Sequence, residues 1–239
     1  MNFHYFEELG STNDHLAAMA EEGAREWTVV IADRQTSGRG RRENDWWSPK
    51  GNLHMSILLR PDVSPRELLR LPVTASLAFL HALGESGSPL KIKWPNDILL
   101  DGRKMTGILV ESKSEGNKVQ WAVVGFGVNM TRDEGDVPAD IKKRLAFVHE
   151  LDSSLEPHEM ALRIISGMKV WSGAVTGKGW EKARTEWTRR ALLKVPYIFR
   201  DGGKNVRGIP LRLDMSGGLV METGDGEITV YSGEMEESV

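Results

Sequence analysis

The sequence of 239 residues contains no cysteine. Disulfide bonds, thiolate metal sites and a cysteine nucleophile are therefore excluded, and a reducing, cytoplasmic location is expected. The chain also has no apolar run of the roughly 18 to 20 residues that span a bilayer, and its N-terminus has no basic segment followed by an apolar stretch. We therefore expect a protein that does not enter a membrane.

The chain has no excess of positive charge either. Its 31 Lys and Arg residues stand against 34 Asp and Glu, which gives a net charge of -3. This balance argues against a protein whose main task is to coat nucleic acid. Hydrophobic residues make up 40% of the sequence, enough to build the core of one or two globular domains.

Apolar alternation and β-branched runs predict strands over much of the first 130 residues. The expected strands cover residues 3–7, 28–33, 53–59, 90–94 and 119–130, with a hairpin that turns at Asp101 and Gly102 and returns over 105–112. Helices are expected from Ser11 or Thr12 to Gly23, after the capping box Ser64 to Glu67 with an interruption at Pro72, and over 138–146, 157–175 and 179–190. Together these elements form a central mixed sheet flanked by helices.

The C-terminal part of the chain has a different pattern. From about residue 194, short strands alternate with glycine pairs, as in RDGGKNV, MSGGLVM and TGDGEI. Such spacing predicts a small barrel. We therefore expect a larger domain over residues 1–190, with Trp180 and Trp187 in its core, and a small β domain over residues 191–239.

The segment from residue 34 to residue 52, here called the arginine loop, begins RQTSGRGRRENDWW. It is longer than the usual connection of about 4 to 6 residues, and long ordered loops are often binding loops. Its glycines allow consecutive amides to face one anion, its arginines suit phosphate, and a tryptophan can stack on an aromatic base. The residues concerned are Gly38, Arg39, Gly40, Arg41, Arg42, Trp46 and Trp47. The alternative is a solvated loop whose arginines bind no ligand.

A second candidate lies in KIKWPNDILLDGRKMTGIL, where Lys93, Asn96, Asp97 and Lys104 fall within one strand and hairpin, near Gly107. At a turn, the side chains of Asn and Asp often form hydrogen bonds with the local backbone and have no other role. An Asp beside two lysines in an apolar sheet needs a further reason, because an unpaired charge away from water is costly. A ligand with phosphates supplies that reason.

The third candidate is VVGFGVNM, where Gly125 and Gly127 interrupt an apolar strand. Glycine within a strand marks a bulge or the close approach of another group. That group is either a ligand or a side chain of the protein itself, such as Trp121 in the case of Gly125.

Taken together, the three motifs resemble the catalytic domain of the biotin protein ligase family. The matching positions are Ser11, Thr12 and Asn13; 35–41; Trp46, Ser48, Pro49, Asn52 and Leu53; 93–97; Lys104, Gly107, Ile108, Leu109 and Glu111; and Gly125, Gly127 and Asn129. The tail resembles the small SH3-like domain of the family. The resemblance implies an α+β fold like that of class II aminoacyl-tRNA synthetases, with a central mixed sheet flanked by helices and a C-terminal SH3-like β-barrel.

The resemblance implies a two-step reaction. Biotin and ATP first form biotinyl-5'-AMP, and biotin then passes to one lysine of a biotin carboxyl carrier protein. The implied catalytic residues are Lys104, Arg39 and Asp97. The implied biotin-binding residues are Ser11, Thr12, Asn13, Gln35, Gly38, Arg39, Gly40, Arg41, Lys104, Gly107, Gly125 and Gly127. The implied ATP-binding residues are Arg39, Arg41, Trp46, Lys93, Asn96, Asp97, Lys104 and Asn129.

Several roles follow from this resemblance. Lys104 would lie between the biotin carboxylate and the α-phosphate, and Asp97 would take the proton of the acceptor lysine. Ser11, Thr12 and Gln35 would bind the ureido ring, with Ser11 as a plain helix cap being the alternative. The glycines of GFG would let the thiophane ring and valeryl chain lie against the backbone, and Trp46 would stack near adenine. Mg²⁺ would be held mostly by phosphate oxygens and water, with Asp97 as a further candidate ligand and no dedicated metal site.

The chain departs from the family at Glu43, Asn44 and Asp45, where relatives carry a further cation before the loop tryptophan. It begins directly at the catalytic domain, so DNA regulation through a winged helix is not expected; a homodimer is left open. Three alternatives remain: a lipoate or octanoate ligase or transferase of the same superfamily, a degenerate noncatalytic biotin-binding paralogue, and a noncatalytic protein that binds RNA or single-stranded DNA.

Overall fold

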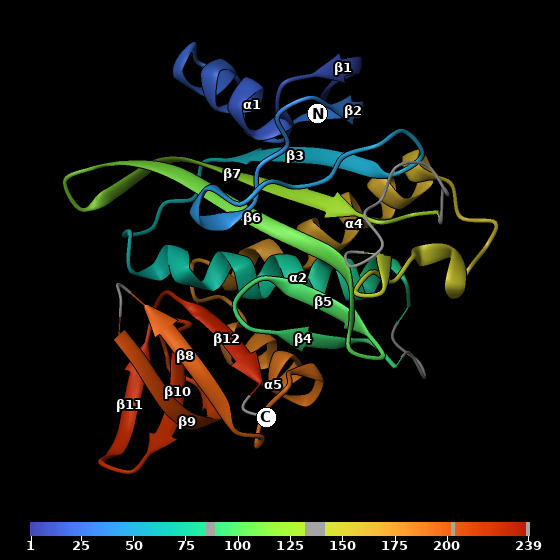
Figure 1. The fold of residues 1–239 in the computed structure, drawn as a ribbon. Coiled ribbons are helices and arrows are strands. Elements are labelled where there is room, and N and C mark those ends of the chain that lie inside the picture. Colours follow the sequence, from blue (N-terminus) through green and yellow to red (C-terminus); the bar gives the residue numbers. More distant parts are fainter. Residues whose placement is uncertain (85–88, 132–141, 202–203, 238–239) are drawn as a thin grey trace.

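The computed structural model describes residues 1–84, 89–131, 142–201 and 204–237. Its centre is a seven-stranded sheet with the strand order β1-β2-β3-β7-β6-β5-β4 (Figure 1). Strands β1 and β2 run parallel and all the other neighbours run antiparallel, so the sheet is mixed as predicted. The strands are β1 (Asn2–Leu9), β2 (Thr28–Gln35), β3 (Leu53–Leu59), β4 (Lys91–Lys93), β5 (Asp97–Leu100), β6 (Arg103–Glu115) and β7 (Lys118–Val128).

Helices cover both faces of this sheet (Figure 1). Helix α1 (Thr12–Glu21) packs on β2, β3 and β7, while α2 (Leu71–Ala82) contacts β6 and α4 (Pro157–Trp171) contacts β3 and α2. Helix α5 (Trp180–Arg190) packs against α2 and β4, and its predicted core residues Trp180 and Trp187 are buried. None of the helices in the described ranges is long and apolar enough to cross a membrane.

The capping box at Ser64 forms, but it does not open an α-helix. Ser64 N donates to Glu67 Oε2 at 2.9 Å, and the residues that follow make a 3-10 turn, η2 (Glu67–Arg70). Helix α2 begins only at Leu71, with Pro72 in its first turn. Proline is tolerated there because the first amides of a helix have no intrahelical acceptor. The predicted interruption is therefore the start of the α-helix itself.

The predicted hairpin between β5 and β6 is confirmed. Asp101 and Gly102 both have positive φ angles, 49° and 75°, as a tight two-residue turn requires. The helix predicted over 138–146 falls partly on residues outside the described ranges. In its described part, Lys142 is helical, residues 143 and 144 form a turn, and Leu145 forms an isolated parallel bridge with Lys104.

A second, antiparallel sheet lies at the C-terminal end, with the strand order β11-β10-β9-β8-β12 (Figure 1). Its strands are β8 (Tyr197–Asp201), β9 (Lys204–Leu213), β10 (Leu219–Thr223), β11 (Gly226–Val230) and β12 (Glu234–Glu237). Tyr197 and Phe199 join the same hydrophobic core as Ile92 of β4 and Trp94 of the β4–β5 connection. The α+β class with a small C-terminal β unit is thus confirmed, whereas the domain boundary after residue 190 stays a prediction.

Candidate active site

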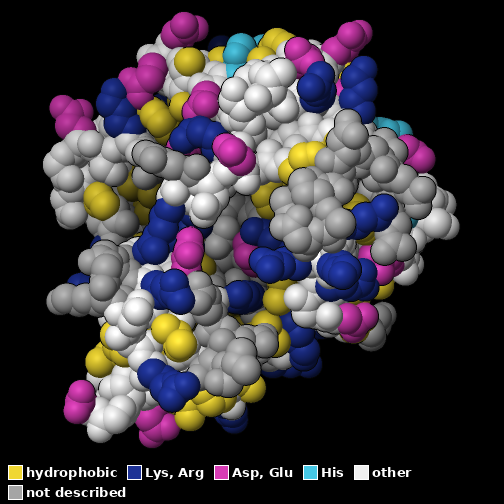
Figure 2. Space-filling view, in the orientation of Figure 1, with side chains coloured by type: hydrophobic (Ala, Val, Ile, Leu, Met, Phe, Trp, Pro, Cys, Tyr) yellow, Lys and Arg dark blue, Asp and Glu magenta, His cyan; other side chains and the backbone are white. Residues whose placement is uncertain are grey.

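A cleft of about 330 Å³ opens where the start of α1, the arginine loop, the β4–β5 connection, β6, β7 and β12 meet. This volume suits a small organic ligand. Predicted site residues that line it are Ser11, Thr12, Asn13, Gln35, Arg39, Gly40, Arg41, Trp46, Lys93, Asn96, Asp97, Lys104, Gly107, Gly125 and Gly127. Motifs far apart in the sequence therefore meet in one cavity, and Lys and Arg side chains gather at the middle of the face seen in Figure 2.

The predicted biotin end of the cleft begins at the N-terminus of α1. Ser11 is its N-cap, and the Ser11 hydroxyl accepts a hydrogen bond from Asp14 N at 3.4 Å. Thr12 does not cap the helix. Its backbone N and its hydroxyl donate to Gln35 Oε1 at 2.8 and 3.1 Å, which joins α1 to β2. The capping role that the sequence left open between these two residues thus belongs to Ser11.

Ser56 extends this polar group, although it was not among the predicted site residues. Its Oγ lies 2.8 Å from Thr12 Oγ1 and 2.6 Å from Asn13 Oδ1, and it is fully buried in β3. Asn13 Nδ2 in turn donates to Glu111 Oε2 at 2.8 Å. The signal in the sequence was a serine within the apolar run LHMSILL, since a buried hydroxyl in such a strand needs a partner.

Side chains of the protein itself occupy the space beside the glycines of β6 and β7. Gly107 and Gly127 are paired in the register of β6 and β7, and the Trp46 ring lies against both. A methyl group at Gly107 would come within 2.7 Å of Trp46 Cζ3, one at Gly127 would overlap the indole, and one at Gly125 would overlap the Asn13 amide. The open backbone predicted for the thiophane ring and valeryl chain is therefore covered in this structure.

Replacing Gly127 with alanine is expected to displace Trp46 from β7, because the new methyl group and the indole cannot occupy the same space. If Trp46 stacks on adenine, loss of that stacking corresponds to about a tenfold rise in the KM for ATP. Gly224→Ala is the matched control, since Gly224 has no atom within 4 Å of the added group. An unchanged KM in Gly127→Ala, with altered tryptophan fluorescence, would contradict the stacking role.

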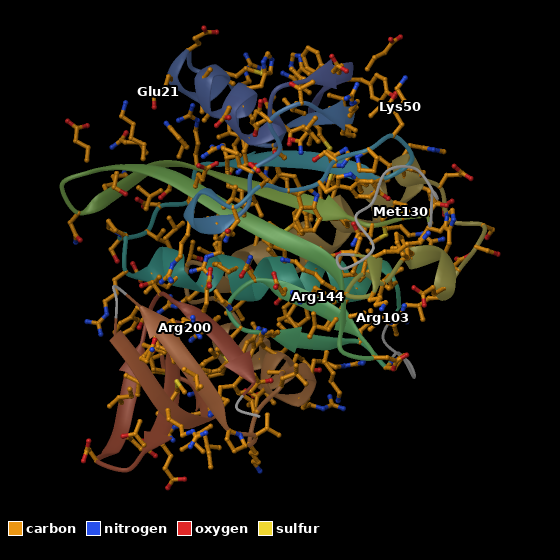
Figure 3. All side chains as sticks on the ribbon, in the orientation of Figure 1. Glu21, Lys50, Arg103, Met130, Arg144 and Arg200 are labelled. Carbon is orange, nitrogen blue, oxygen red and sulfur yellow. The ribbon has the colours of Figure 1, made fainter. Side chains whose placement is uncertain are left out.

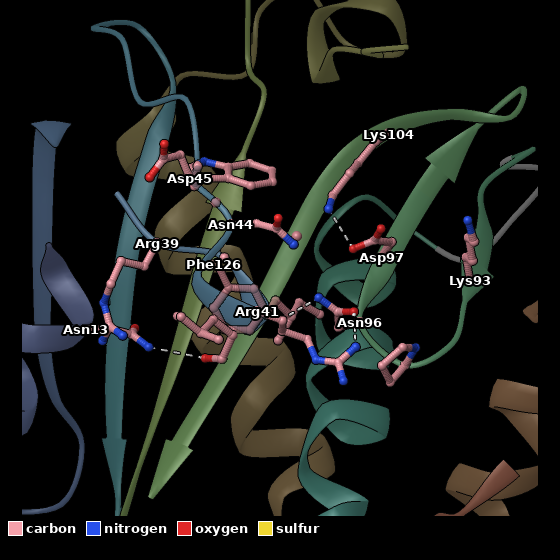
Figure 4. A pocket seen from close by; sticks show the side chains of 18 of the residues that line it. Asn13, Arg39, Arg41, Asn44, Asp45, Lys93, Asn96, Asp97, Lys104 and Phe126 are labelled. Carbon is pink, nitrogen blue, oxygen red and sulfur yellow. Dashed lines mark hydrogen bonds and ion pairs between the residues drawn. The ribbon is translucent and has the colours of Figure 1, made fainter. Parts of the chain in front are cut away.

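Lys104 reaches the cleft from β6. Its Nζ lies 2.8 Å from Asp97 Oδ1 and 5.1 Å from the centroid of the Trp46 ring. Figure 4 shows Lys104 and Asp97 directed toward each other, with the Asn44 amide nearby. Both charged side chains are partly buried, and the two residues, which were predicted separately, form an ion pair.

The backbone of Lys104 is held from the other side by residues 144–146. Lys104 N donates to the carbonyl oxygen of Arg144 at 2.7 Å, and Ala146 N donates to that of Lys104 at 2.9 Å. Figure 3 labels Arg103 and Arg144 at this end of β6.

Asn129, predicted beside the nucleotide, does not line the cleft; its Nδ2 donates to the Lys104 carbonyl oxygen at 3.0 Å. Asn129 thus positions Lys104.

The arginine loop is tied to the C-terminal sheet. Arg41 Nη1 donates to the Gly233 carbonyl oxygen at 3.0 Å and to Asn96 Oδ1 at 3.4 Å (Figure 4), and Arg42 Nη1 donates to the Arg200 carbonyl oxygen at 3.3 Å. Gly38, the other predicted residue outside the cleft lining, accepts from Trp46 N at 2.8 Å. The loop therefore folds back on itself between two sheets.

Arg39 has two acidic partners. Its guanidinium pairs with Asp14 of α1 and, at 2.8 Å, with Glu111 Oε1 of β6. Partial burial acts to lower the pKa of Arg39, but the hydrogen bonds and charges of Glu111 and Asp14 outweigh it and raise the pKa. Glu111 belongs to the matching family pattern but was not predicted as a site residue.

Acidic residues offset most of the positive charge of the cleft lining. Four cationic side chains and three carboxylates line it: Arg39, Arg41, Lys93 and Lys104, and Asp45, Asp97 and Glu234. Glu234 comes from β12 and was not among the predicted site residues. Across the described ranges no group of three or more His, Asp or Glu residues is placed to hold a metal ion. Magnesium bound through ATP phosphates stays a prediction.

His54 is a buried histidine on β3, opposite Gly127, which the sequence did not single out. Its Nδ1 lies 3.3 Å from the Ala32 carbonyl oxygen, and its Nε2 has no hydrogen-bond partner within the described ranges. Burial lowers the pKa of His54 to about 4, although the Ala32 carbonyl and the charge of Asp33 act to raise it. The side chain is therefore neutral at neutral pH.

This burial predicts that acid destabilises the fold. An unfolded chain takes up this proton near pH 6.5, whereas the folded protein does so only near pH 4. The stabilisation is complete above pH 6.5 and is lost as the pH falls toward 4, by about 2 kcal/mol at pH 5. Urea unfolding at pH 7 and at pH 5 measures this difference in the free energy of unfolding. His54→Gln should lose this part of the pH dependence, and exposed His158→Gln should keep it.

Comparisons with known proteins agree with this geometry. The model of the biotin/lipoate A/B protein ligase family matches residues 5–129, more than half of the sequence, and the chain belongs to this family. It is 34% identical over 212 residues to the biotin–(acetyl-CoA-carboxylase) ligase of Paracoccus denitrificans, which covers 86% of this chain and 88% of that protein. It is 30% identical to the bifunctional ligase/repressor BirA of Bacillus subtilis, over 97% and 73% of the two chains.

Solved structures give the same result. The biotin protein ligase from Aquifex aeolicus in complex with biotin and ATP superposes with a TM-score of 0.82 and 27% sequence identity, covering 98% of this chain and 97% of that one. The resemblance inferred from the motifs is thus confirmed at the level of the family and of the fold.

Proposed function

We propose that this protein is an ATP-dependent biotin protein ligase, which forms biotinyl-5'-AMP and transfers the biotinyl group to a lysine of a biotin carboxyl carrier protein. One observation carries the proposal. A partly buried polar end, made by Thr12 and Gln35, and a charged end, made by Lys104 and Asp97, belong to one cleft of ligand size. The relatives named above are consistent with it.

In the first step, an oxygen of the biotin carboxylate attacks the α-phosphorus of ATP, and the bond to the departing pyrophosphate breaks. Both reactants are anionic, so the site must neutralise charge at the reacting atoms and on the leaving group. Lys104 is suited to the reacting atoms because Asp97 and the Trp46 ring already fix the position of its ammonium group. Magnesium enters as part of the MgATP substrate.

In the second step, the amine of the acceptor lysine attacks the acyl carbon and AMP leaves. At a reference pKa near 10.4 that amine is almost wholly protonated at neutral pH, so it must lose a proton before it attacks. Asp97 is the carboxylate beside Lys104 that lines the cleft. We assign to it the role of accepting or steering this proton.

Incorporation of labelled biotin into a carrier domain, with MgATP present, tests the proposal directly. Pyrophosphate exchange into ATP that depends on biotin should accompany it, and lipoate and octanoate serve as competing acids. Exchange that depends on lipoate and not on biotin would indicate a lipoate ligase. Folded protein that binds biotin without exchange would indicate a noncatalytic paralogue. We also propose a cytoplasmic location, whereas we propose neither DNA binding nor a homodimer.

A further inference from the structure

Arg39 is a predicted phosphate ligand, yet in this structure it is bound by the protein's own carboxylates. Asp14 accepts from Nη2 and, at 3.2 Å, from Nε, while Glu111 accepts from Nη2 at 2.8 and 3.0 Å. One positive charge is thus shared by two negative charges, which leaves a net negative charge where an anionic nucleotide is expected. Figure 4 shows Arg39 beside Asn13, on the opposite side of the cleft from Lys104.

The contacts of this guanidinium are unevenly distributed over its nitrogens. Three carboxylate oxygens lie within hydrogen-bonding distance of Nη2, which carries only two hydrogens, whereas Nη1 donates to no residue of the described ranges. The two Nη2 hydrogens therefore serve two carboxylates, and the two oxygens of Glu111 share one of them. Removing one carboxylate would leave Arg39 paired and would release N–H groups for another anion.

Asp14 is the partner that can leave. Its side chain is 55% exposed, against 30% for Glu111, so water can solvate it when it releases Arg39. It also lies in the first turn of α1, where the helix N-terminus stabilises a negative charge without the arginine. Glu111 is held more firmly, because Asn13 Nδ2 donates to the same carboxylate.

We propose that Asp14 competes with the phosphates of the nucleotide for Arg39, while Glu111 keeps the guanidinium positioned at the cleft. Asp14 thereby lowers the affinity for ATP: the phosphates reach the Nε and Nη2 hydrogens that it occupies only by displacing it. This inference rests on the proposed function, since it requires that a nucleotide enters this cleft.

Asp14→Asn tests the competition. The amide keeps the size of the side chain and removes its charge, and an exposed pair of this kind contributes a factor of about two to five. We expect the Kd for ATP, measured by calorimetry with biotin present, and the KM for ATP in pyrophosphate exchange both to fall about two- to fivefold. The gain should shrink as KCl increases. Glu8→Gln, which removes one charge from the exposed pair with Arg34, is the matched control and should change neither constant.

Two further variants separate competition from a general charge effect. In an Arg39→Ala background, Asp14→Asn should leave the affinity for ATP unchanged, because no guanidinium remains to be released. Glu111→Gln leaves the Asp14 contacts in place and should not tighten ATP binding. Equal tightening in Asp14→Asn and Glu111→Gln, or a gain that persists without Arg39, would overturn the inference.

The wild-type protein distinguishes this inference from the function itself. Absence of biotin-dependent pyrophosphate exchange in wild type would refute the proposed function. Normal exchange in wild type, with an unchanged or higher Kd for ATP in Asp14→Asn, would refute only the competition.

Discussion

Replacing Lys104 with alanine is expected to slow the formation of biotinyl-5'-AMP by a factor on the order of 10² to 10³, by analogy with the loss of one preorganised donor at a developing charge. The ammonium group is held 2.8 Å from Asp97 and over the Trp46 ring, so it needs little rearrangement when charge develops on the reacting atoms. Biotin-dependent pyrophosphate exchange measures the rate. Because the effect arises in the transition state, kcat should fall far more than the affinity for biotin.

The surface provides a matched control for this variant. Lys118 pairs with Asp62 at 3.1 Å on an exposed part of the molecule, so Lys118→Ala removes the same charge and the same kind of contact away from the cleft. It should exchange pyrophosphate at the wild-type rate. A Lys104→Ala variant that folds normally and keeps near-normal turnover would exclude the role assigned to this lysine.

Asp97→Asn is expected to slow the transfer of biotin from preformed biotinyl-5'-AMP to the carrier lysine by roughly 10²-fold, which is within the range for general acid–base catalysis. The amide keeps the shape of the side chain but cannot accept the proton. Because Asp97 also holds Lys104, adenylate formation should slow as well. Single-turnover transfer from isolated adenylate separates the two effects.

Raising the pH should partly rescue transfer in Asp97→Asn, since a larger fraction of the acceptor lysine is then deprotonated without help. Asp62→Asn is the control, as the other half of the exposed pair with Lys118. Slower adenylate formation together with wild-type transfer from preformed adenylate would rule out Asp97 as the proton acceptor and leave it only the positioning of Lys104.

Much of the local structure follows from local residue chemistry. The turn at Asp101 and Gly102, the cap at Ser11 and the β-branched run of β2 each depend on a few neighbouring residues, and each is formed as expected. The motifs of the cleft were also identified in advance, because arginines, glycines and a lysine beside a carboxylate are unusual within an apolar sheet.

Contacts between distant residues were not predictable in the same way. Gly127 and Trp46 are 81 positions apart in the sequence, and only the register of β6 and β7 and the path of the arginine loop bring the indole onto the glycine. Asn129 was expected at the nucleotide but bonds to the backbone of Lys104, because the end of β7 lies beside the start of β6. Which residues lie beside each other on neighbouring strands depends on the register of the whole sheet.

The residue types in the motifs, by themselves, determined the family, the fold class and the kind of chemistry, since phosphate binding and carboxylate activation need those groups wherever they lie in space. The tertiary structure alone decided which groups are engaged with each other. Arg39 is paired with Asp14 and Glu111 across three different elements, and β12 brings Glu234 to the cleft. Electrostatic interactions depend on distance in space, which the order of residues along a chain does not specify.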